Sequence, residues 1–282
     1  MIVDSHTHIF PEAIRMKREA FCGRDEGFSS IYRNPRAKLI GAEELVASMD
    51  ETGVRCSVAC GFSWKSPELC HLHNLYLLET ASRHSDRIVP FICLAFSDPD
   101  RALKELESGM RGGARGVGEI AFYGRAMTSQ DLESMKPVLG RMEKDRIPLL
   151  LHTNETIGHS YPGKGETPLE RYCEFALSYP GLPIVLAHWG GGLLFYELMP
   201  EVRKELTNVY YDTAASPFLY SNKIYGIGSE IVGAERILFG SDFPLISPWR
   251  YFREIEESRL RREDQERILG INLSRLLGLQ KH

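Results

Sequence analysis

Short apolar runs alternate along the chain with longer stretches in which apolar residues recur at helical spacing. Apolar runs of this length, bounded by turn residues, are typical of buried strands. The triplet Leu149-Leu150-Leu151 is apolar at every position, as expected for a parallel strand covered on both faces. The pattern predicts eight strands, at residues 2–5, 55–60, 88–96, 114–119, 147–152, 183–188, 209–213 and 236–240.

A helical pattern follows each predicted strand, and several of these helices carry start signals such as Ser66-Pro67 and Asp98-Pro99. Strict alternation of strand and helix indicates a parallel sheet, and eight such units fit a closed (β/α)8 TIM barrel. We therefore expect one α/β domain over residues 1–282, with no linker. The expected helices lie at 12–20, 42–51, 68–84, from 98, and at 129–144, 168–178, 193–206, 222–232, 251–261 and 262–277.

Residues 9–40 form a stretch longer than an ordinary connection between a strand and a helix, and it contains Pro11, Gly23, Gly27 and Pro35. We interpret it as an insertion after the first strand. Long connections in compact domains often serve as lids or binding loops.

Composition narrows the function classes only a little. The chain has 282 residues, 43% of them hydrophobic and 26% charged, with a net charge of -4 and a pI near 6.2. The acidic balance gives no overall attraction for nucleic acid, and no apolar run is long enough for a membrane span. We expect no signal peptide, reduced and mostly buried thiols at the six cysteines, and a cytoplasmic protein.

The first strand leads into Asp4-Ser5-His6-Thr7-His8. Side chains alternate in an extended chain, so His6 and His8 share a face and can grip one metal ion. Other ligand-type residues follow later strands, and a barrel brings all the carboxyl ends of its strands to one rim. These residues are Glu119, His152, His188 and Asp242.

Each of these residues alone has an ordinary explanation. His152 or His188 could be a hydrogen-bonded residue at the edge of the core, Glu119 could pair with a nearby arginine, and Asp242 could cap a turn. For all these residues to have ordinary roles, each explanation would have to hold independently, at the same end of five different strands. Four imidazoles and two carboxylates buried together without a cation would be costly, so we predict a metal site.

At these motifs the sequence resembles the amidohydrolase superfamily over essentially the whole chain. The segments 238–244 (LFGSDFP) and 272–279 (NLSRLLGL) are similar to its amidohydrolase-related branch, which also contains aromatic-acid decarboxylases. Gly118-Glu119-Ile120 is instead similar to two-metal members such as the TatD-like hydrolases. Typical decarboxylases of the branch lack that glutamate and hold one metal.

The resemblance implies that His6, His8 and Asp242 bind one divalent transition metal, most often zinc. A second ion would lie on His152 and His188, with Glu119 bridging the two. Mn, Fe and Ni suit the same ligands. Whether one or two ions bind stays open.

The resemblance further implies that Asp242 is the catalytic general base and that His188 orients water or acts as an acid if one metal is present. The expected reaction is hydrolysis of an amide, ester or lactone bond in a small molecule by metal-bound water. The alternatives are a lyase, either a non-oxidative decarboxylase or a hydratase, a TatD-like nuclease, and a barrel that has become a binding protein. Such barrels often form homo-oligomers.

Loops after the strands should decide the substrate. The side chains that we expect to contact it are Trp64, Arg125, His159 and Trp189. Arg125, Lys164 and Lys65 could bind an anionic substrate, although each alone could equally be a solvated surface charge.

Overall fold

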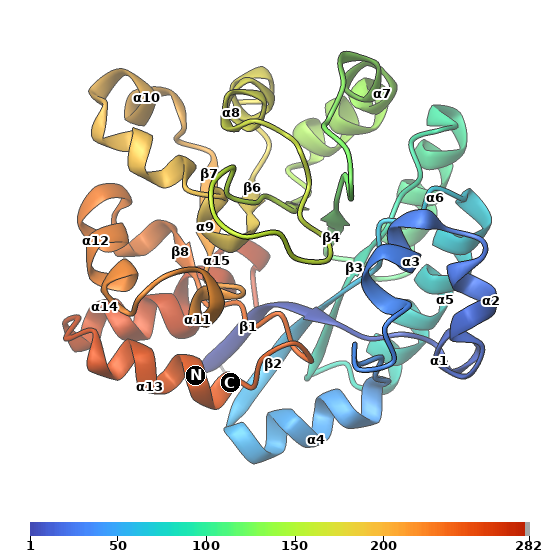
Figure 1. Cartoon of the computed structure of the whole chain (residues 1–282), viewed down its shortest axis with the longest axis horizontal. Helices are drawn as coiled ribbons and strands as arrows, with labels where there is room; N and C mark the ends of the chain where they lie inside the picture. Colours follow the sequence, from blue (N-terminus) through green and yellow to red (C-terminus); the bar gives the residue numbers. More distant parts are fainter. Residues whose placement is uncertain (280–282) are drawn as a thin grey trace.

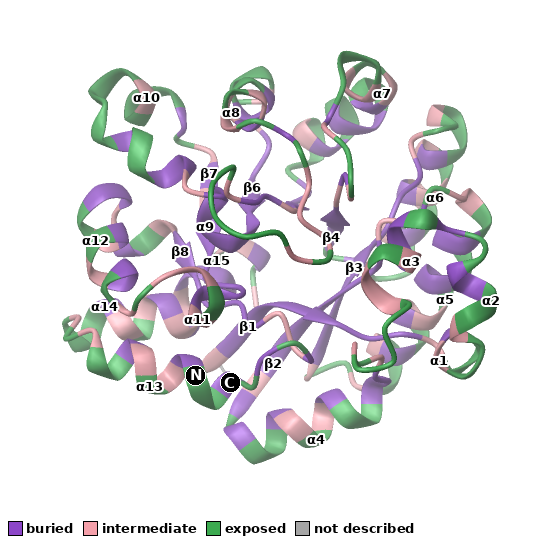
Figure 2. Ribbon diagram, in the orientation of Figure 1, coloured by how far each residue is buried: buried purple, intermediate pink, exposed green. Residues whose placement is uncertain are grey.

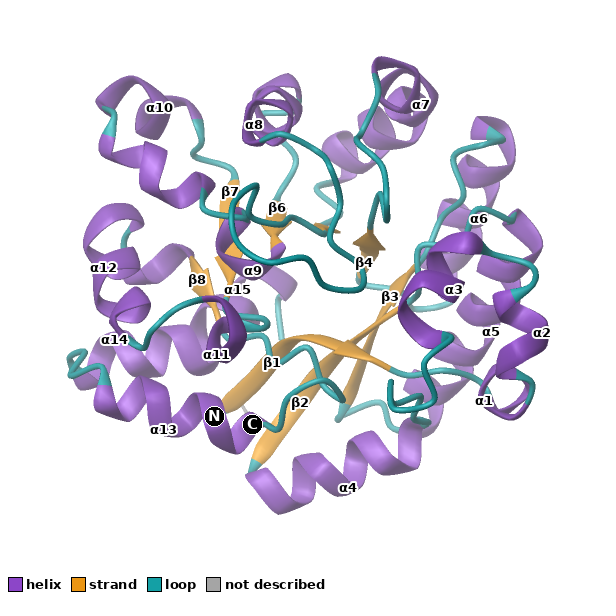
Figure 3. Cartoon of the chain, viewed as in Figure 1, coloured by secondary structure: helices purple, strands orange, loops and turns teal. Residues whose placement is uncertain are grey.

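Eight parallel strands form one sheet in the order β1 to β8, each paired with its neighbour in sequence (Figures 1 and 3). The computed structural model describes residues 1–279. All eight strands lie where the apolar runs predict them, although the later ones are shorter than expected. Their bounds are β1 Ile2–His8, β2 Val54–Cys60, β3 Ile88–Ile92, β4 Gly116–Ile120, β5 Leu149–Leu151, β6 Ile184–Leu186, β7 Val209–Asp212 and β8 Ile237–Leu238.

Main-chain contacts between β1 and the segment after β8 close the sheet into a barrel. The Ser5 amide donates to the Phe239 carbonyl at 2.8 Å, and Thr7 pairs in parallel with Phe243. The Asp242 amide donates to the His6 carbonyl at 2.9 Å. The predicted (β/α)8 TIM-barrel class is confirmed, and the closure brings the end of β1 next to the end of β8.

Helices surround the strands on the outside (Figures 1 and 3). The larger ones are α4 Ala42–Thr52, α5 Pro67–Arg83, α6 Pro99–Arg111, α7 Ser129–Asp145, α8 Leu169–Ser178, α12 Lys223–Val232 and α13 Pro248–Glu257. Shorter helical segments are α9 Ala187–Gly190, η1 Leu193–Leu198, α10 Pro200–Glu205, α11 Ser216–Leu219, η2 Ala234–Arg236, α14 Arg262–Glu266, η3 Arg267–Ile271 and α15 Asn272–Leu277. Among the helices of residues 1–279, none combines the length and apolar character needed to cross a bilayer.

The strands are buried on both faces, which explains their continuous apolar sequence (Figure 2). In β5, Leu149 and Leu151 belong to the large core between strands and helices, whereas Leu150 packs with Val3, Val58 and other strand residues in a separate cluster. Alternate residues therefore face the outer layer and the barrel interior, as the two-residue period of a strand requires.

The 9–40 segment folds into three short helices, α1 Glu12–Met16, α2 Arg18–Cys22 and α3 Glu26–Tyr32. Its aromatic side chains form a small core of their own with the loop after β2. Phe28 stacks on Trp64 with ring centroids 4.9 Å apart, and Tyr32 lies 5.9 Å from Phe62. This packing fixes the segment over the end of the barrel from which the loops after the strands emerge.

Candidate metal centre and cavity

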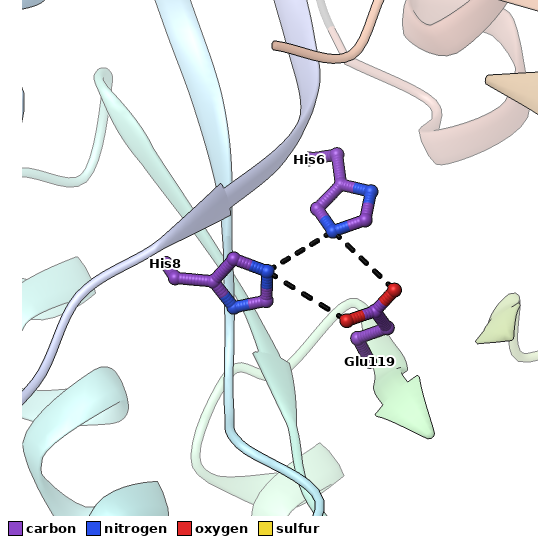
Figure 4. Close-up of side chains that lie close together, drawn as sticks. All are labelled: His6, His8 and Glu119. Carbon is purple, nitrogen blue, oxygen red and sulfur yellow. Dashed lines mark hydrogen bonds and ion pairs between the residues drawn. The ribbon is translucent and has the colours of Figure 1, made fainter. Parts of the chain in front are cut away.

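Two histidines of β1 lie side by side at the carboxyl end of the barrel, as the alternation predicts. The Nε2 atoms of His6 and His8 are 3.0 Å apart, and both residues are buried (Figure 4). Glu119, at the end of β4, faces them from across the barrel, 3.6 Å from His6 Nε2 and 3.7 Å from His8 Nε2. These three side chains form the first ligand group.

The same glutamate belongs to a second group with His152 and His188, which follow β5 and β6. Glu119 Oε1 is 2.9 Å from His152 Nδ1 and 3.7 Å from His188 Nε2. His188 Nε2 and His152 Nδ1 are 3.2 Å apart. Glu119 therefore lies between the two groups, with one oxygen close to donors of both.

Asp242 comes from the segment that closes the barrel. Its Oδ1 lies 3.4 Å from His8 Nε2 and 3.8 Å from His6 Nε2, which places it beside the first group. Its side chain is 16% exposed, against 4% for Glu119, so Asp242 is the carboxylate more open to a bound molecule. All six predicted ligand side chains are thus brought together by the fold.

His188 does not continue β6 as the sequence suggests. His188 and Trp189 have positive φ angles of 56° and 59°, and Gly190 and Gly191 continue this left-handed turn. Left-handed backbone costs an L-residue about 1–2 kcal/mol, so packing must hold it. At Gly191 a Cβ atom would lie 2.4 Å from the Asn154 carbonyl oxygen, and only glycine fits there. The turn directs His188 Nε2 towards Glu119.

Asp212, at the end of β7, orients two of the histidines and was missed by the sequence reasoning. Its Oδ2 accepts a hydrogen bond from His6 Nδ1 at 2.8 Å, and its Oδ1 accepts from the backbone amides of His188 at 2.8 Å and Ala214 at 3.0 Å. The bond to Nδ1 makes Nε2, which faces the cluster, the nitrogen of His6 that can bind a metal ion. A carboxylate at the end of the predicted seventh strand is the signal in the sequence that points to it.

The mixture of carboxylates and imidazoles shifts several pKa values. Burial alone would raise the pKa of Glu119, but His152 and His6 hold it well below its usual range. Burial lowers the pKa of His188, yet the hydrogen bond with Glu119 and the charges of Asp242 and Asp212 outweigh it and raise that pKa to about 9. Protons thus occupy imidazoles that a cation would need in neutral form.

The geometry of the donors fits a divalent ion. Neighbouring ligand atoms of one ion bound at about 2.0–2.2 Å lie about 3–3.5 Å apart, and the separations within each ligand group run from 2.9 to 3.7 Å. Imidazole and carboxylate donors suit zinc and manganese alike. The residues therefore fit a metal centre, with Glu119 placed to be shared if two ions bind.

A cavity of about 730 Å³ opens above the cluster. His8, Glu119, His152, His188 and Asp242 line it, and so does His159, one of the four predicted substrate contacts. The rest of its wall is largely aromatic and aliphatic. The other lining residues are Ile31, Tyr32, Asn34, Arg36, Ala37, Lys38, Phe62, Tyr123, Tyr161, Pro162, Gly163, Ala215, Pro217, Phe218, Leu219, Pro244 and Leu245.

The structure places Trp64, Trp189 and Arg125 outside this cavity. Both tryptophans are buried, and the indole nitrogen of Trp64 donates to His73 while that of Trp189 donates to Ser216. Arg125 pairs with Asp131, 2.6 Å away. A loop residue that follows a strand can point into the cavity or away from it, depending on local packing. The sequence pattern does not show which of the two directions a side chain takes.

The sequence model of the amidohydrolase family matches residues 3–279. The chain belongs to the amidohydrolase family.

Two similar proteins are decarboxylases. Gamma-resorcylate decarboxylase from Rhizobium radiobacter is 24% identical over 302 aligned positions, which cover 88% of this chain and 87% of that protein. The crystal structure of 5-carboxyvanillate decarboxylase from Sphingomonas paucimobilis matches with a TM-score of 0.81 at 15% identity and covers 99% of each chain.

A third similar protein carries a metal. Dihydroxybenzoic acid decarboxylase from Polaromonas sp. JS666, solved with manganese and the inhibitor 2-nitroresorcinol, matches with a TM-score of 0.72 at 18% identity. The match covers 100% of this chain and 98% of that one. Manganese in that protein supports a divalent metal here but gives no specific support to zinc.

These findings overturn the expected reaction. The prediction of a metal-dependent hydrolase is wrong, because the gamma-resorcylate, 5-carboxyvanillate and dihydroxybenzoic acid decarboxylases to which the chain is similar are lyases that release carbon dioxide. The error has a physical origin: histidines and carboxylates at strand ends fix where a metal binds, and the same ligands serve hydrolysis and decarboxylation. The lyase alternative is the one that the relatives favour.

Proposed function

We propose that the protein is a metal-dependent, non-oxidative decarboxylase of an aromatic carboxylic acid. The observation that carries the proposal is the cluster of His6, His8, Glu119 and Asp242 at the closed end of a mostly apolar cavity. The three decarboxylases to which the chain is similar support this reaction over hydration.

The reaction sets two requirements. The bond between the ring carbon and the carboxylate breaks, its electron pair stays on the ring carbon, carbon dioxide leaves, and a proton is added to that carbon. The site must therefore hold the anionic acid next to positive charge and must deliver one proton. An apolar wall suits the ring and the uncharged product.

His6, His8, Glu119 and Asp242 would hold the metal ion, and His152 and His188 could hold a second ion that shares Glu119. A bound divalent cation supplies positive charge that attracts the oxygens of the substrate and stabilises electron density left on the ring. Asp212 keeps Nδ1 of His6 protonated and so presents its Nε2 to the cluster.

Asp242 is our candidate for the proton carrier, because it lines the cavity and is the more exposed carboxylate of the cluster. Burial raises the pKa of its carboxyl, but the hydrogen bond with His8 and the charges of His6 and His188 outweigh this and lower the pKa. His188 also lines the cavity, and its Nδ1 is fixed by the Ala214 carbonyl at 3.0 Å. The lowered pKa leaves Asp242 ionised, so it must receive a proton before it can pass one to the ring carbon. A protonated His188 is the group that would supply this proton when no second ion is bound.

The proposal extends to three properties of the protein as a whole. We propose that it acts on a small molecule and not on nucleic acid, that it is cytoplasmic, and that it self-associates. Its net charge of -4 and six free cysteines are consistent with the first two. Light scattering on purified protein tests the third.

The experiment is a decarboxylation assay on protein purified without chelators and loaded with Mn²⁺ or Zn²⁺. We expect carbon dioxide and the decarboxylated product from at least one benzoate-type acid in a panel that includes gamma-resorcylate and 5-carboxyvanillate. Asp242→Asn should reduce turnover at least 100-fold. Metal-loaded protein that releases carbon dioxide from none of the panel would overturn the proposed reaction. Metal analysis of the same sample distinguishes one equivalent from two.

A further inference from the structure

One wall of the cavity comes from the end of the 9–40 segment. Six residues of this segment line the cavity: Ile31, Tyr32, Asn34, Arg36, Ala37 and Lys38. Arg36 and Lys38 are exposed, whereas Glu119 and His188 at the other end are buried. The two cations therefore lie at the opening of the cavity and the metal ligands at its closed end.

Charge is distributed unevenly along this cavity. Of the Asp, Glu, Lys and Arg side chains described in residues 1–279, four line it: Glu119 and Asp242 at the closed end, and Arg36 and Lys38 at the opening. Neither cation forms an ion pair within the part of the chain that the structure describes. Their charges are therefore available to a ligand in the cavity.

The other cations that the sequence offered for anion binding are already paired. Lys65 lies 2.9 Å from Glu26, Arg125 lies 2.6 Å from Asp131, and Lys164 lies 3.6 Å from Glu155. None of these three lysine or arginine residues lines the cavity. Arg36 and Lys38, in contrast, line the cavity and form no ion pair with the residues that the structure describes.

The backbone that carries the two cations is held in place. The Arg18 guanidinium donates to the Asn34 and Ala37 carbonyls, at 2.9 Å each. The Asn34 side chain accepts from the Arg36 amide at 3.0 Å, and the Ala37 amide donates to the Asn34 carbonyl at 3.0 Å. Arg36 and Lys38 thus project from an anchored turn, which lowers the entropic cost of ligand binding.

We propose that Arg36 and Lys38 form an anion-binding subsite, and that the substrate is an aromatic carboxylate with a second anionic group at its far end. This inference rests on the proposed function, since the first carboxylate is taken to lie at the metal cluster. A cavity of about 730 Å³ falls within the range of about 300–1,000 Å³ that holds drug-sized ligands. A one-ring acid with a single carboxylate would leave the opening and its two cations without a partner.

Equilibrium binding to Mn²⁺-loaded protein, measured by isothermal titration calorimetry, tests the subsite without relying on catalysis. The probes are two pairs of different length: benzene-1,3-dicarboxylate with benzoate, and biphenyl-4,4′-dicarboxylate with biphenyl-4-carboxylate. We expect at least one dicarboxylate to bind about tenfold tighter than its monocarboxylate partner, with an advantage that shrinks as salt rises. Equal affinity within both pairs would overturn the proposal.

Matched variants locate the effect. Arg36→Gln combined with Lys38→Gln should weaken dicarboxylate binding about tenfold, since partly exposed ion contacts each contribute up to about fivefold, and should leave the monocarboxylate within twofold. Arg33→Gln is the control, because Arg33 is exposed on the same segment, bonds Ser29 Oγ and does not line the cavity. A dicarboxylate advantage that survives the double variant, or that Arg33→Gln removes equally, contradicts the assignment.

The outcomes separate the two proposals. If the dicarboxylate binds more tightly only when Arg36 and Lys38 are present, but no acid releases carbon dioxide, the subsite is retained and the decarboxylase proposal is overturned. Carbon dioxide release from an acid of the panel, together with equal affinity within both probe pairs, would retain the decarboxylase and overturn the subsite.

Discussion

Asp212→Asn should weaken metal binding although Asp212 is not itself a ligand. Its Oδ1 accepts two backbone amides, from His188 at 2.8 Å and Ala214 at 3.0 Å, so the remaining oxygen of the asparagine must stay there. The new NH₂ group then takes the place of Oδ2, 2.8 Å from His6 Nδ1. An NH₂ group can only donate, so His6 must accept at Nδ1 and carry its proton on Nε2.

That change puts a proton on the atom that faces the first ligand group. His6 Nε2 lies 3.0 Å from His8 Nε2, and a metal ion must displace the proton before His6 can bind it. Partners of this kind typically change metal affinity by about 10–100-fold, or about 1.4–2.7 kcal/mol. The fold should be kept, because both backbone hydrogen bonds are kept.

The assay is the dissociation constant of Mn²⁺, measured by competition with a chelator at pH 7.5. Asp50→Asn is the control, since Asp50 is a carboxylate 62% exposed in its side chain and paired with Arg87 on the surface. We expect the control to match the parent protein and Asp212→Asn to bind at least tenfold more weakly, with ¹⁵N shifts of His6 that report the changed tautomer. An Mn²⁺ affinity within twofold of the parent, in a folded protein, would refute the tautomer argument.

Three further predictions concern pH, the left-handed turn and a buried ion pair. Metal affinity should fall as pH is lowered from 9 to 6, because the pKa of His188 is raised to about 9 and protons compete with the ion throughout this range. Chelator competition at several pH values measures this affinity, and an affinity that does not change with pH contradicts the prediction. Gly191→Ala should lower both melting temperature and turnover, since its Cβ would meet the Asn154 carbonyl oxygen at 2.4 Å; parent-like values would show that the turn can shift at no cost. Glu197→Gln should destabilise the fold by about 3–5 kcal/mol in urea unfolding, because it leaves Arg236 without its buried partner; a loss below about 1 kcal/mol would mean that solvent reaches the pair.

Much of the fold follows from local pattern. Eight apolar runs separated by helical segments are a property of neighbouring residues, and such runs become buried parallel strands whatever the rest of the chain does. Given a barrel, the carboxyl ends of the strands must meet, so His6, His152 and Asp242 could be placed together without coordinates. The structure brings these side chains together as expected.

The same rule covers Asp212 as well, but it reaches only as far as the strands do. Asp212 ends the seventh strand and therefore belongs to the same rim as the metal-binding residues. The left-handed turn at His188 could not be read from local pattern, because its cost is offset by contacts with distant residues such as Asp212. The reaction was predicted incorrectly because metal ligands do not specify the bond that breaks.

The sequence by itself thus determined the barrel and the ring of metal-binding side chains, both of which depend on short-range periodicity and chain closure. Tertiary structure decided which loop residues face the cavity. It buried Trp64 and Trp189 in the core, paired Arg125 with Asp131, and turned Arg36 and Lys38 towards the opening. The direction of a loop side chain depends on packing between segments far apart in the chain, and no local pattern encodes that packing.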